Sequence, residues 1–173
     1  MHLHLTALAA LVNMDVTASM SSRPPSTGPM PSPAAVRAWV NLMRAQRLAL
    51  TNIEHELKAA GLPPLGWYDV LLELVRSEDG KLRPYEIEER ILLEQHNLSR
   101  LLDRMEKQGL VRREAFEEDG RGRWVVVTNA GRAMQSRMWS VYGPAIQKHV
   151  GTKLGKASAA QLADLLAALA RQS

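Results

Sequence analysis

The sequence predicts a mainly helical protein with one small β-hairpin in its second half. Leu and Ala are frequent, whereas the 173 residues include one Phe and three Tyr, a composition that favours helices. Apolar residues recur at helical spacing along most of the chain. Between residues 110 and 128 this spacing gives way to two short apolar runs around a glycine-containing turn, which is typical of a hairpin.

The composition excludes several kinds of protein. The chain has no cysteine, so it has no disulfide framework, thiolate metal site or cysteine redox sensor. It has no run of about 18 apolar residues, so we expect no transmembrane helix and no membrane partner. The formal net charge of +4 is compatible with a polyanionic partner.

The first part of the chain predicts a tail followed by a long helix. Residues 13–32 are rich in Ser, Pro, Thr and Met without any period, and we expect residues 1–31 to form a mostly disordered tail. Ser32 is a good N-cap and Pro33 suits the first turn of a helix. This helix forms a segment over residues 32–61, and its apolar stripe runs along its whole length.

Three helices are predicted in the next segment. Residues 66–76 form a helix that is apolar nearly all round, which indicates a central, buried position. The turn SEDGKL leads to a short helix that begins at Pro84. A third helix spans about residues 94–108, with Leu98, Leu101, Leu102 and Met105 on one face and Gly109 as the residue that ends it.

The rest of the chain predicts a hairpin and further helices. LVRREAF and RWVVVT are the two strands, and EEDGRG is the turn between them, which completes a segment over residues 62–128. Thr128 caps a helix that Pro144 kinks or restarts. A last helix carries Leu162, Leu165 and Leu169 on one side, within an end segment over residues 129–173.

Two short helices joined by a tight turn and followed at once by a hairpin make a winged helix-turn-helix. The second helix presents polar and guanidinium side chains of a size that reaches base edges in a major groove. Arginines at the hairpin tip suit a neighbouring minor groove, and Asp119 could orient Arg121 by a charge-assisted hydrogen bond. The candidate DNA contacts are Gln95, His96, Asn97, Ser99, Arg100, Arg104, Asp119, Arg121 and Arg123.

The run LSRLLDRMEKQGLVRREAFEEDGRGRWVVVTNAGRA resembles the signature of the MarR family of bacterial transcriptional regulators. The family pattern is a Ser or Thr, then R-L-x-D-R-L-E-x-x-G-L-V-x-R, an acid-x-R wing and a closing L-T-x-x-G. It is matched here by Ser99, Arg100, Leu101, Asp103, Arg104, Met105, Glu106, Gly109, Leu110, Val111, Arg113, Asp119, Arg121, Val127, Thr128 and Gly131. The resemblance implies a cytoplasmic regulator, a repressor, that binds double-stranded DNA in a sequence-specific way.

The end helices carry more apolar surface than one small winged-helix core covers, and a second copy is the simplest partner. The resemblance likewise implies a two-fold homodimer held by the N- and C-terminal helices, and hence a palindromic site. It also implies a small effector, commonly phenolic or a carboxylate, that binds between these helices and the winged module. The candidate ligand contacts are Trp39, Arg44, Arg47, Trp67, Tyr68 and Asp69.

Other interpretations stay open at this point. The chain lacks the common catalytic motifs, so we expect no enzyme, no catalytic residue, no cofactor and no metal. Residues 83–123 hold nine Lys and Arg against ten Asp and Glu, so a protein- or RNA-binding winged helix without specific DNA recognition is the alternative. Arg100 and Arg104 could pair with Asp103 or Glu106 instead of DNA, and Asn97 could turn back towards the preceding turn.

Overall fold

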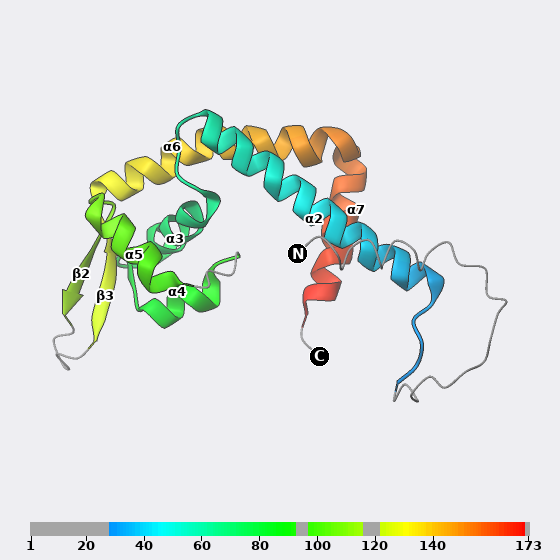
Figure 1. The fold of residues 1–173 in the computed structure, drawn as a ribbon, viewed down its shortest axis with the longest axis horizontal. Coiled ribbons are helices and arrows are strands. Elements are labelled where there is room, and N and C mark those ends of the chain that lie inside the picture. Colours follow the sequence, from blue (N-terminus) through cyan, green and yellow to red (C-terminus); the bar gives the residue numbers. More distant parts are fainter. Residues whose placement is uncertain (1–27, 93–96, 116–121, 172–173) are drawn as a thin grey trace. The chain divides into compact units, whose positions relative to one another are not determined.

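The structure is a computed structural model that describes residues 28–92, 97–115 and 122–171 (Figure 1). The chain divides into a unit of residues 1–38 and a unit of residues 39–173. The helices are α2 (Pro33–Ala59), α3 (Leu65–Arg76), α4 (Pro84–Arg90), α5 (Leu98–Lys107), α6 (Asn129–Ile146), the π-helical segment η1 (Gln147–Gly151) and α7 (Thr152–Ala170). The strands are β1 (Lys81–Leu82), β2 (Val111–Ala115) and β3 (Arg123–Val127). The mainly helical fold with a hairpin is therefore confirmed.

Most predicted helix ends agree with the structure, because short-range signals set them. The Ser32 hydroxyl accepts a hydrogen bond from the Ala35 N–H at 3.1 Å, which makes it the N-cap of α2. Thr128 Oγ1 accepts one from the Gly131 N–H at 3.0 Å and caps α6 in the same way. Gly109 takes a positive φ of 70° after α5, and the Leu110 N–H bonds the Met105 carbonyl at 3.0 Å. The tail expected over residues 1–31 lies mostly outside the described residues.

The predicted start of the third helix, near residue 94, is wrong. Asn97 has a non-helical backbone, with φ −151° and ψ 66°, and its side chain accepts a hydrogen bond from the Arg100 N–H at 3.1 Å. An asparagine in this position satisfies one of the backbone donors at a helix start. Helix α5 therefore begins at Leu98, and α4 and α5 are the two helices of the helix-turn-helix.

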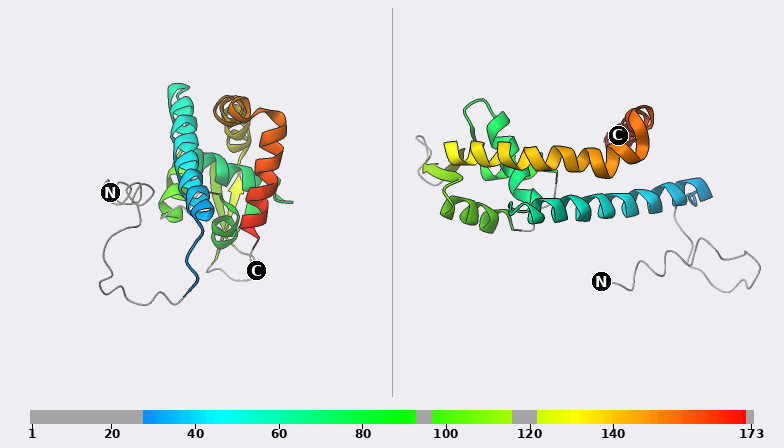
Figure 2. Two further views of the ribbon diagram at one scale, coloured as in Figure 1. Left: turned by 90° about the vertical axis from the view of Figure 1, so that its right-hand side faces the viewer. Right: turned by 90° about the horizontal axis from the view of Figure 1, so that it is seen from above.

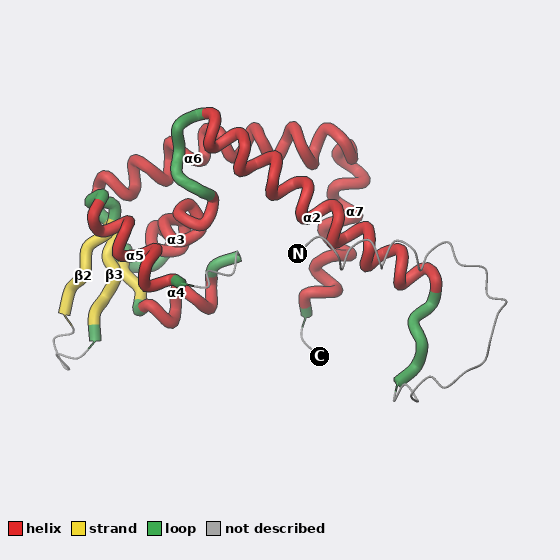
Figure 3. The backbone as a smooth tube through the Cα atoms, in the orientation of Figure 1, coloured by secondary structure: helices red, strands yellow, loops and turns green. Residues whose placement is uncertain are grey.

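The sheet has three strands, although the sequence predicted only two. Its order is β1-β3-β2 and both pairs are antiparallel, with Val111 opposite Val127 and Ala115 opposite Arg123. Figure 3 shows β2 and β3 side by side as the predicted hairpin. The added strand, β1, pairs Lys81 with Val126 and is only two residues long. A strand that short has no alternation to read, and the sequence indicated only a turn there.

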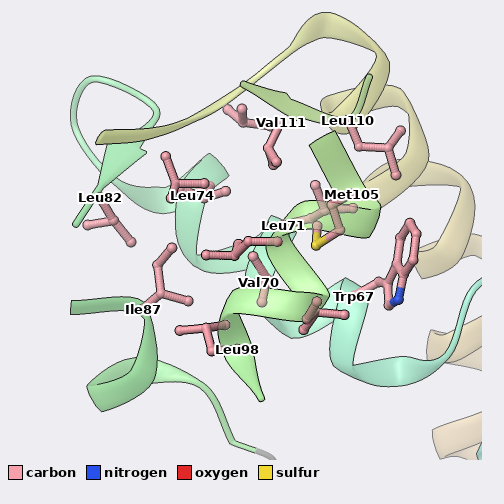
Figure 4. Packing of buried hydrophobic residues seen from close by; sticks show 14 residues of the cluster. Trp67, Val70, Leu71, Leu74, Leu82, Ile87, Leu98, Met105, Leu110 and Val111 are labelled. Carbon is pink, nitrogen blue, oxygen red and sulfur yellow. The ribbon is translucent and has the colours of Figure 1, made fainter. Parts of the chain in front are cut away.

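The core of the winged module surrounds α3 (Figure 4). Leu71 and Leu74 of α3 are fully buried, as are Ile87 of α4 and Met105 of α5. Burial of each such side chain contributes about 1.5–3 kcal/mol relative to exposure. The rest of this cluster is Trp67, Val70, Leu82, Leu98, Leu101, Leu102, Leu110, Val111, Val125 and Val127. The apolar faces predicted for α3 and α5 are thus the faces that hold the module together.

A second cluster joins α2, α3 and α6. Leu57 of α2 and Met138 of α6 are fully buried, and Tyr68 of α3 is 4% exposed. The Glu54 carboxylate of α2 also accepts a hydrogen bond from the Leu65 N–H at 2.9 Å, at the first residue of α3. The end of α2 is therefore anchored to the winged module by apolar packing and by a cap that comes from another helix.

Pro144 does not end α6. The helix runs through Pro144 to Ile146 and continues as η1, whose line follows that of α6 in the right-hand view of Figure 2. A proline has no N–H for the helical hydrogen-bond ladder, and the wider π turn begins three residues after it, at Gln147. The helical backbone breaks instead at Gly155, where φ is 71° and ψ is 164°. Along the part of the chain that the structure describes, none of the helices is both long and apolar enough to cross a membrane.

Candidate functional site

Helix α5 divides its side chains between the core and solvent. Leu98 and Met105 point into the core of the winged module (Figure 4). Ser99, Arg100 and Arg104 are exposed on the opposite side. The division follows from the 3.6-residue period, because residues three and four apart share one face. The sequence therefore places three of its candidate contacts on one exposed surface of a short, well-anchored helix.

The acids of α5 are bound to an arginine of β2. The Arg113 guanidinium donates hydrogen bonds to the Asp103 carboxylate at 2.6 Å and to the Glu106 carboxylate at 2.5 Å. The backbone N–H of Arg113 donates another to the Glu106 carboxylate at 3.0 Å. Burial by itself lowers the pKa of Arg113, but the hydrogen bonds and charges of Asp103 and Glu106 outweigh it and raise that pKa above its usual value. This ion-pair cluster fixes α5 against the hairpin.

Arg100 and Arg104 do not form the intrahelical pairs that the sequence left open. Asp103 and Glu106 are occupied by Arg113, and no described residue forms an ion pair with Arg100 or Arg104. Two exposed guanidinium groups thus lie on the outer face of α5. Residues 83–123 are nearly neutral in total, but Asp103 and Glu106 of α5 are already paired with Arg113. The near-neutral total therefore does not prevent α5 from presenting positive charge.

The start of α5 contains the other candidates. Asn97 is exposed, and its side-chain oxygen is used as the cap of the helix, so its amide nitrogen is the group that remains for a partner. Gln95 and His96 lie outside the described residues. They stay predictions, as does the geometry of the turn between α4 and α5.

The hairpin carries one described candidate. Arg123 is exposed at the first residue of β3, opposite Ala115 at the end of β2. Asp119 and Arg121, with the pairing proposed between them, lie outside the described residues. The next residue of β3, Trp124, contacts two cations, and its ring lies 5.3 Å from Lys81 Nζ and 5.1 Å from the Arg83 guanidinium. The sequence did not single out Trp124, since its partners come from the unpredicted strand β1 and its neighbour.

A cavity of about 430 Å³ lies between α3 and α6. Its volume is in the range of roughly 300–1,000 Å³ that small-molecule sites occupy. Of the predicted ligand contacts, only Tyr68 and Asp69 line it. Its remaining lining residues are Leu72, Arg76, Leu92, Gln135, Trp139, Tyr142 and Ile146.

The other predicted ligand contacts lie elsewhere. Trp67 belongs to the core of the winged module and is 6% exposed (Figure 4). Trp39, Arg44 and Arg47 are exposed on α2 and do not line the cavity. The structure thus does not bring the six predicted residues together. The missed residues Gln135, Trp139 and Tyr142 follow one another four and three positions apart, so they formed a readable stripe on one face of the predicted helix.

Three aromatic rings meet in the cavity wall. The Tyr68 and Tyr142 ring centroids are 5.0 Å apart at 74°, and Trp139 lies 6.1 Å from Tyr68 and 5.9 Å from Tyr142. The Tyr68 hydroxyl accepts a hydrogen bond from Gln135 Nε2 at 3.3 Å. Burial raises the pKa of both tyrosines, and the negative charge of Asp69 raises them further.

Neither surface resembles a metal centre. Over the described ranges, no three His, Asp or Glu side chains gather in a way that suits a metal ion. What the described residues offer is an exposed, positively charged helix face next to a hairpin, and a separate aromatic cavity. The first is suited to a polyanion and the second to a small molecule.

Comparison with known proteins gives a consistent result. The MarR family model matches residues 60–122, from the residue that follows α2 to the residue before β3. AbsC, a MarR family transcriptional regulator from Streptomyces coelicolor, is 25% identical, and the match covers 83% of this chain and 96% of AbsC with a TM-score of 0.71. Among proteins of curated function, none matches this chain significantly.

Two further solved structures contain DNA. Sco3205, a MarR family transcriptional regulator from Streptomyces coelicolor in complex with DNA, is 23% identical over 84% of this chain and 91% of its own, with a TM-score of 0.74. The transcriptional repressor CouR, bound to a 23-mer DNA duplex, is 25% identical over 77% of this chain and 92% of its own, with a TM-score of 0.68. The winged-helix fold predicted from the order of elements is therefore confirmed.

Proposed function

Because this chain is a member of the MarR family of transcriptional regulators, we propose that it binds specific double-stranded DNA in the cytoplasm and represses transcription. The family consists of regulators and not of enzymes, in line with the absence of catalytic motifs from the sequence. The DNA-bound structures of Sco3205 and CouR support a duplex as the partner. The observation that carries the proposal is the pair of exposed arginines, Arg100 and Arg104, that have no ionic partner among the described residues on α5.

The physical argument starts from what a recognition helix must supply. A guanidinium that contacts a phosphate or a base gives up part of its hydration. If it is also held in an ion pair within the protein, that ion pair must be broken first, which weakens the binding. Arg113 removes this cost by holding Asp103 and Glu106. We therefore assign DNA contact to Ser99, Arg100 and Arg104, with Asn97 at the helix start and Arg123 on the hairpin.

We propose further that the functional unit is a homodimer. Helix α7 has no buried residue, yet it carries Leu162, Leu165, Leu166 and Leu169, which are 37%, 59%, 36% and 74% exposed. Trp39 and Leu48 of α2 are also more than half exposed. A second copy covers this surface, and two-fold symmetry then calls for a palindromic site with half-sites one helical turn, about 10 base pairs, apart.

A small ligand in the cavity between α3 and α6 is the proposed effector. The cavity wall includes Leu92, which comes two residues after the end of α4, so occupancy bears on the position of α4 in the helix-turn-helix. A ligand that binds more tightly to one position of α4 than to another shifts the population towards that position. Relief of repression follows when the favoured arrangement does not match the DNA.

Selection of binding sites from a random duplex pool tests the proposal. Wild type is compared with Arg100→Ala, Arg104→Ala and the wing-tip variant Arg121→Ala, and Arg137→Ala serves as the control for loss of one exposed charge on α6. We expect an enriched palindrome for wild type and the control. Loss of a base contact by either α5 variant should cost about 1–3 kcal/mol of binding and relax specificity at one position.

Salt dependence separates this outcome from non-specific attraction. Affinity should fall steeply with salt, with a slope of roughly 0.9 per phosphate contact, and a variant that loses a phosphate contact should have a shallower slope. Failure to enrich any sequence at low salt would contradict sequence-specific binding. If Arg100→Ala and Arg104→Ala bind DNA as tightly as the control does, the proposal that α5 is the DNA-reading helix is contradicted.

A further inference from the structure

The charged residues in the described wall of the cavity between α3 and α6 already have partners. Asp69, on α3, is only 4% exposed and has an interaction partner in the structure. The other charged residue of the described wall is Arg76, whose side chain is 67% exposed and lies 3.6 Å from Glu73. A charged ligand would therefore lose hydration on entering the cavity without gaining a counter-charge of its own, which is costly.

Most of the described wall is aromatic or aliphatic. The rings of Tyr68 and Trp139 are stacked, with centroids 6.1 Å apart, and Tyr142 meets both of them edge to face. Leu72 of α3 and Ile146 of α6 add aliphatic surface. Such a wall attracts an aromatic ligand through burial of apolar area and through stacked or edge-to-face ring contacts.

The wall also contains a hydroxyl group that is available as a donor. None of the described residues forms a hydrogen bond with the Tyr142 hydroxyl, whereas the Tyr68 hydroxyl accepts one from Gln135 Nε2 at 3.3 Å. Burial, followed by the negative charge of Asp69, raises the pKa of Tyr142, so this hydroxyl keeps its proton. Asp69 and Tyr68 both act on that pKa and both line the cavity, so the donor lies beside the space for a ligand.

We propose that this cavity binds an uncharged aromatic molecule that carries a hydrogen-bond acceptor, with the Tyr142 hydroxyl as the donor and the rings of Tyr68 and Trp139 against the ligand. The inference names the ligand class of the proposed effector site and rests on that proposed role. The cavity of about 430 Å³ has room for two fused rings with a carbonyl substituent.

The same wall disfavours the carboxylate effector that the family resemblance implied. Arg44 and Arg47, the arginines expected to pair with an anion, do not line the cavity. A carboxylate needs a cation or several N–H donors to replace its hydration, and Arg76 is largely solvated and lies beside Glu73. An uncharged acceptor needs a single donor, which Tyr142 supplies.

Equilibrium dialysis of the full chain without DNA tests the ligand class with four probes of similar shape. 2-Acetonaphthone is the uncharged ketone, 2-naphthoate is the anion, 2-naphthamidinium is the cation, and 2-isopropenylnaphthalene replaces the carbonyl oxygen by a methylene group. We expect the ketone to bind at least about tenfold more tightly than either ion and roughly two- to tenfold more tightly than the alkene. Tighter binding of any other probe overturns the proposal, as does the absence of binding by all four.

A single-atom change tests the hydrogen bond. Tyr142→Phe keeps the ring and removes the hydroxyl, so it should weaken binding of the ketone roughly two- to tenfold and leave that of the alkene unchanged. Tyr85→Phe is the matched control, because Tyr85 is 53% exposed on α4 and does not line the cavity. Equal binding of the ketone by wild type and Tyr142→Phe overturns the proposal.

A second variant tests the ring contacts and decides the matter if Tyr142→Phe does not fold. Trp139→Leu should weaken binding of both the ketone and the alkene by roughly two- to tenfold. Trp39→Leu is its control, because Trp39 and Trp139 are 57% and 50% exposed and only Trp139 lines the cavity. Unchanged binding of the ketone by Trp139→Leu overturns the proposal.

A DNA-binding measurement separates this inference from the effector role. The selected duplex is titrated with wild type at one salt concentration, with and without 2-acetonaphthone. Binding of the ketone without any change in DNA affinity overturns the effector role and leaves the ligand class standing. Release of DNA by 2-naphthoate, without binding of the ketone, supports the effector role and overturns the ligand class. The dialysis contains no DNA, so it decides the ligand class even if no duplex is selected.

Discussion

At the scale of single residues, Arg113 determines what α5 offers to a partner. It lies on β2 and takes both acids of α5, one at 2.6 Å and one at 2.5 Å. The side chains of this cluster are 25–52% exposed, so the ion pairs contribute only about 0.2–1 kcal/mol each to stability. Their larger effect is on function, because they remove two negative charges from the helix that is proposed to meet phosphates.

Arg113→Met should therefore lower DNA affinity more than it lowers stability. We expect a fall of only a few degrees in the unfolding temperature but a loss of about 1–3 kcal/mol in binding to the selected duplex. The triple variant with Asp103→Asn and Glu106→Gln should recover part of the affinity, because the freed acids are then neutral. No recovery in the triple variant would mean that Arg113 acts through contact with DNA or through the fold.

At the scale of elements, η1 shows how a change of helix type creates a contact. Lys148 Nζ lies 2.6 Å from Glu56 Oε1, and His149 Nε2 lies 3.2 Å from the same oxygen. In an α-helix the side chains of consecutive residues point about 100° apart. Lys148 and His149 lie in the π-helical segment, and both contact the same carboxylate of α2. The contact ties the end of α2 to the helical segment that follows α6.

This cluster predicts an acid-dependent loss of stability. The hydrogen bond from Lys148, followed by that from His149, lowers the pKa of Glu56 below its usual value of 4.5. A lowered folded-state pKa means that the stabilisation is complete above pH 4.5 and is lost as the pH falls through the folded-state pKa. The unfolding temperature of wild type should exceed that of Glu56→Gln by about 1–3 °C at pH 6, and the difference should disappear in acid. A difference that stays constant with pH would contradict this assignment.

At the scale of the whole molecule, the exposed apolar surface of α7 is the part of the chain that we propose a second copy covers. Leu165 and Leu169 are 59% and 74% exposed, and they repeat on one face of a helix that has no buried residue. A monomeric protein seldom leaves such a stripe open to water. In the proposed dimer these leucines lie in the interface, and the spacing between the two recognition helices depends on them.

Leu165→Glu should dissociate the dimer. A buried, unpaired carboxylate in the interface costs several kcal/mol, so sedimentation should give the 19.2 kDa monomer in place of a species of twice that mass. Ala167→Glu is the control, because it adds the same charge to an exposed position on the opposite side of α7. DNA binding should fall with dimerisation in the first variant only. A dimeric Leu165→Glu protein would place the interface elsewhere.

Much of the fold could be predicted because its signals are local. The division of α5 into buried leucines and exposed arginines needs only the helical period, and the caps by Ser32 and Thr128 act over three residues. The glycine after α5 is set by its positive φ, which a residue with a Cβ rarely adopts. In the candidate site, the same reasoning identified Ser99, Arg100 and Arg104 as a group.

Other features depend on residues that are distant in the sequence, and only the tertiary structure decided them. Strand β1 is two residues long and exists because β3 lies beside it. Arg113 could be assigned to Asp103 and Glu106, and Glu54 to the start of α3, only once the helices and strands were placed. The cavity joins Tyr68 and Asp69 to residues about 70 positions later in the sequence, and Arg44 and Arg47, which were predicted from α2, do not line it. By itself the sequence determined the helices, the hairpin and the exposed face of α5, because hydrophobic periodicity and capping act within a few residues. Which charges cancel, and which side chains enclose a ligand-sized space, was decided by contacts between elements that no local pattern encodes.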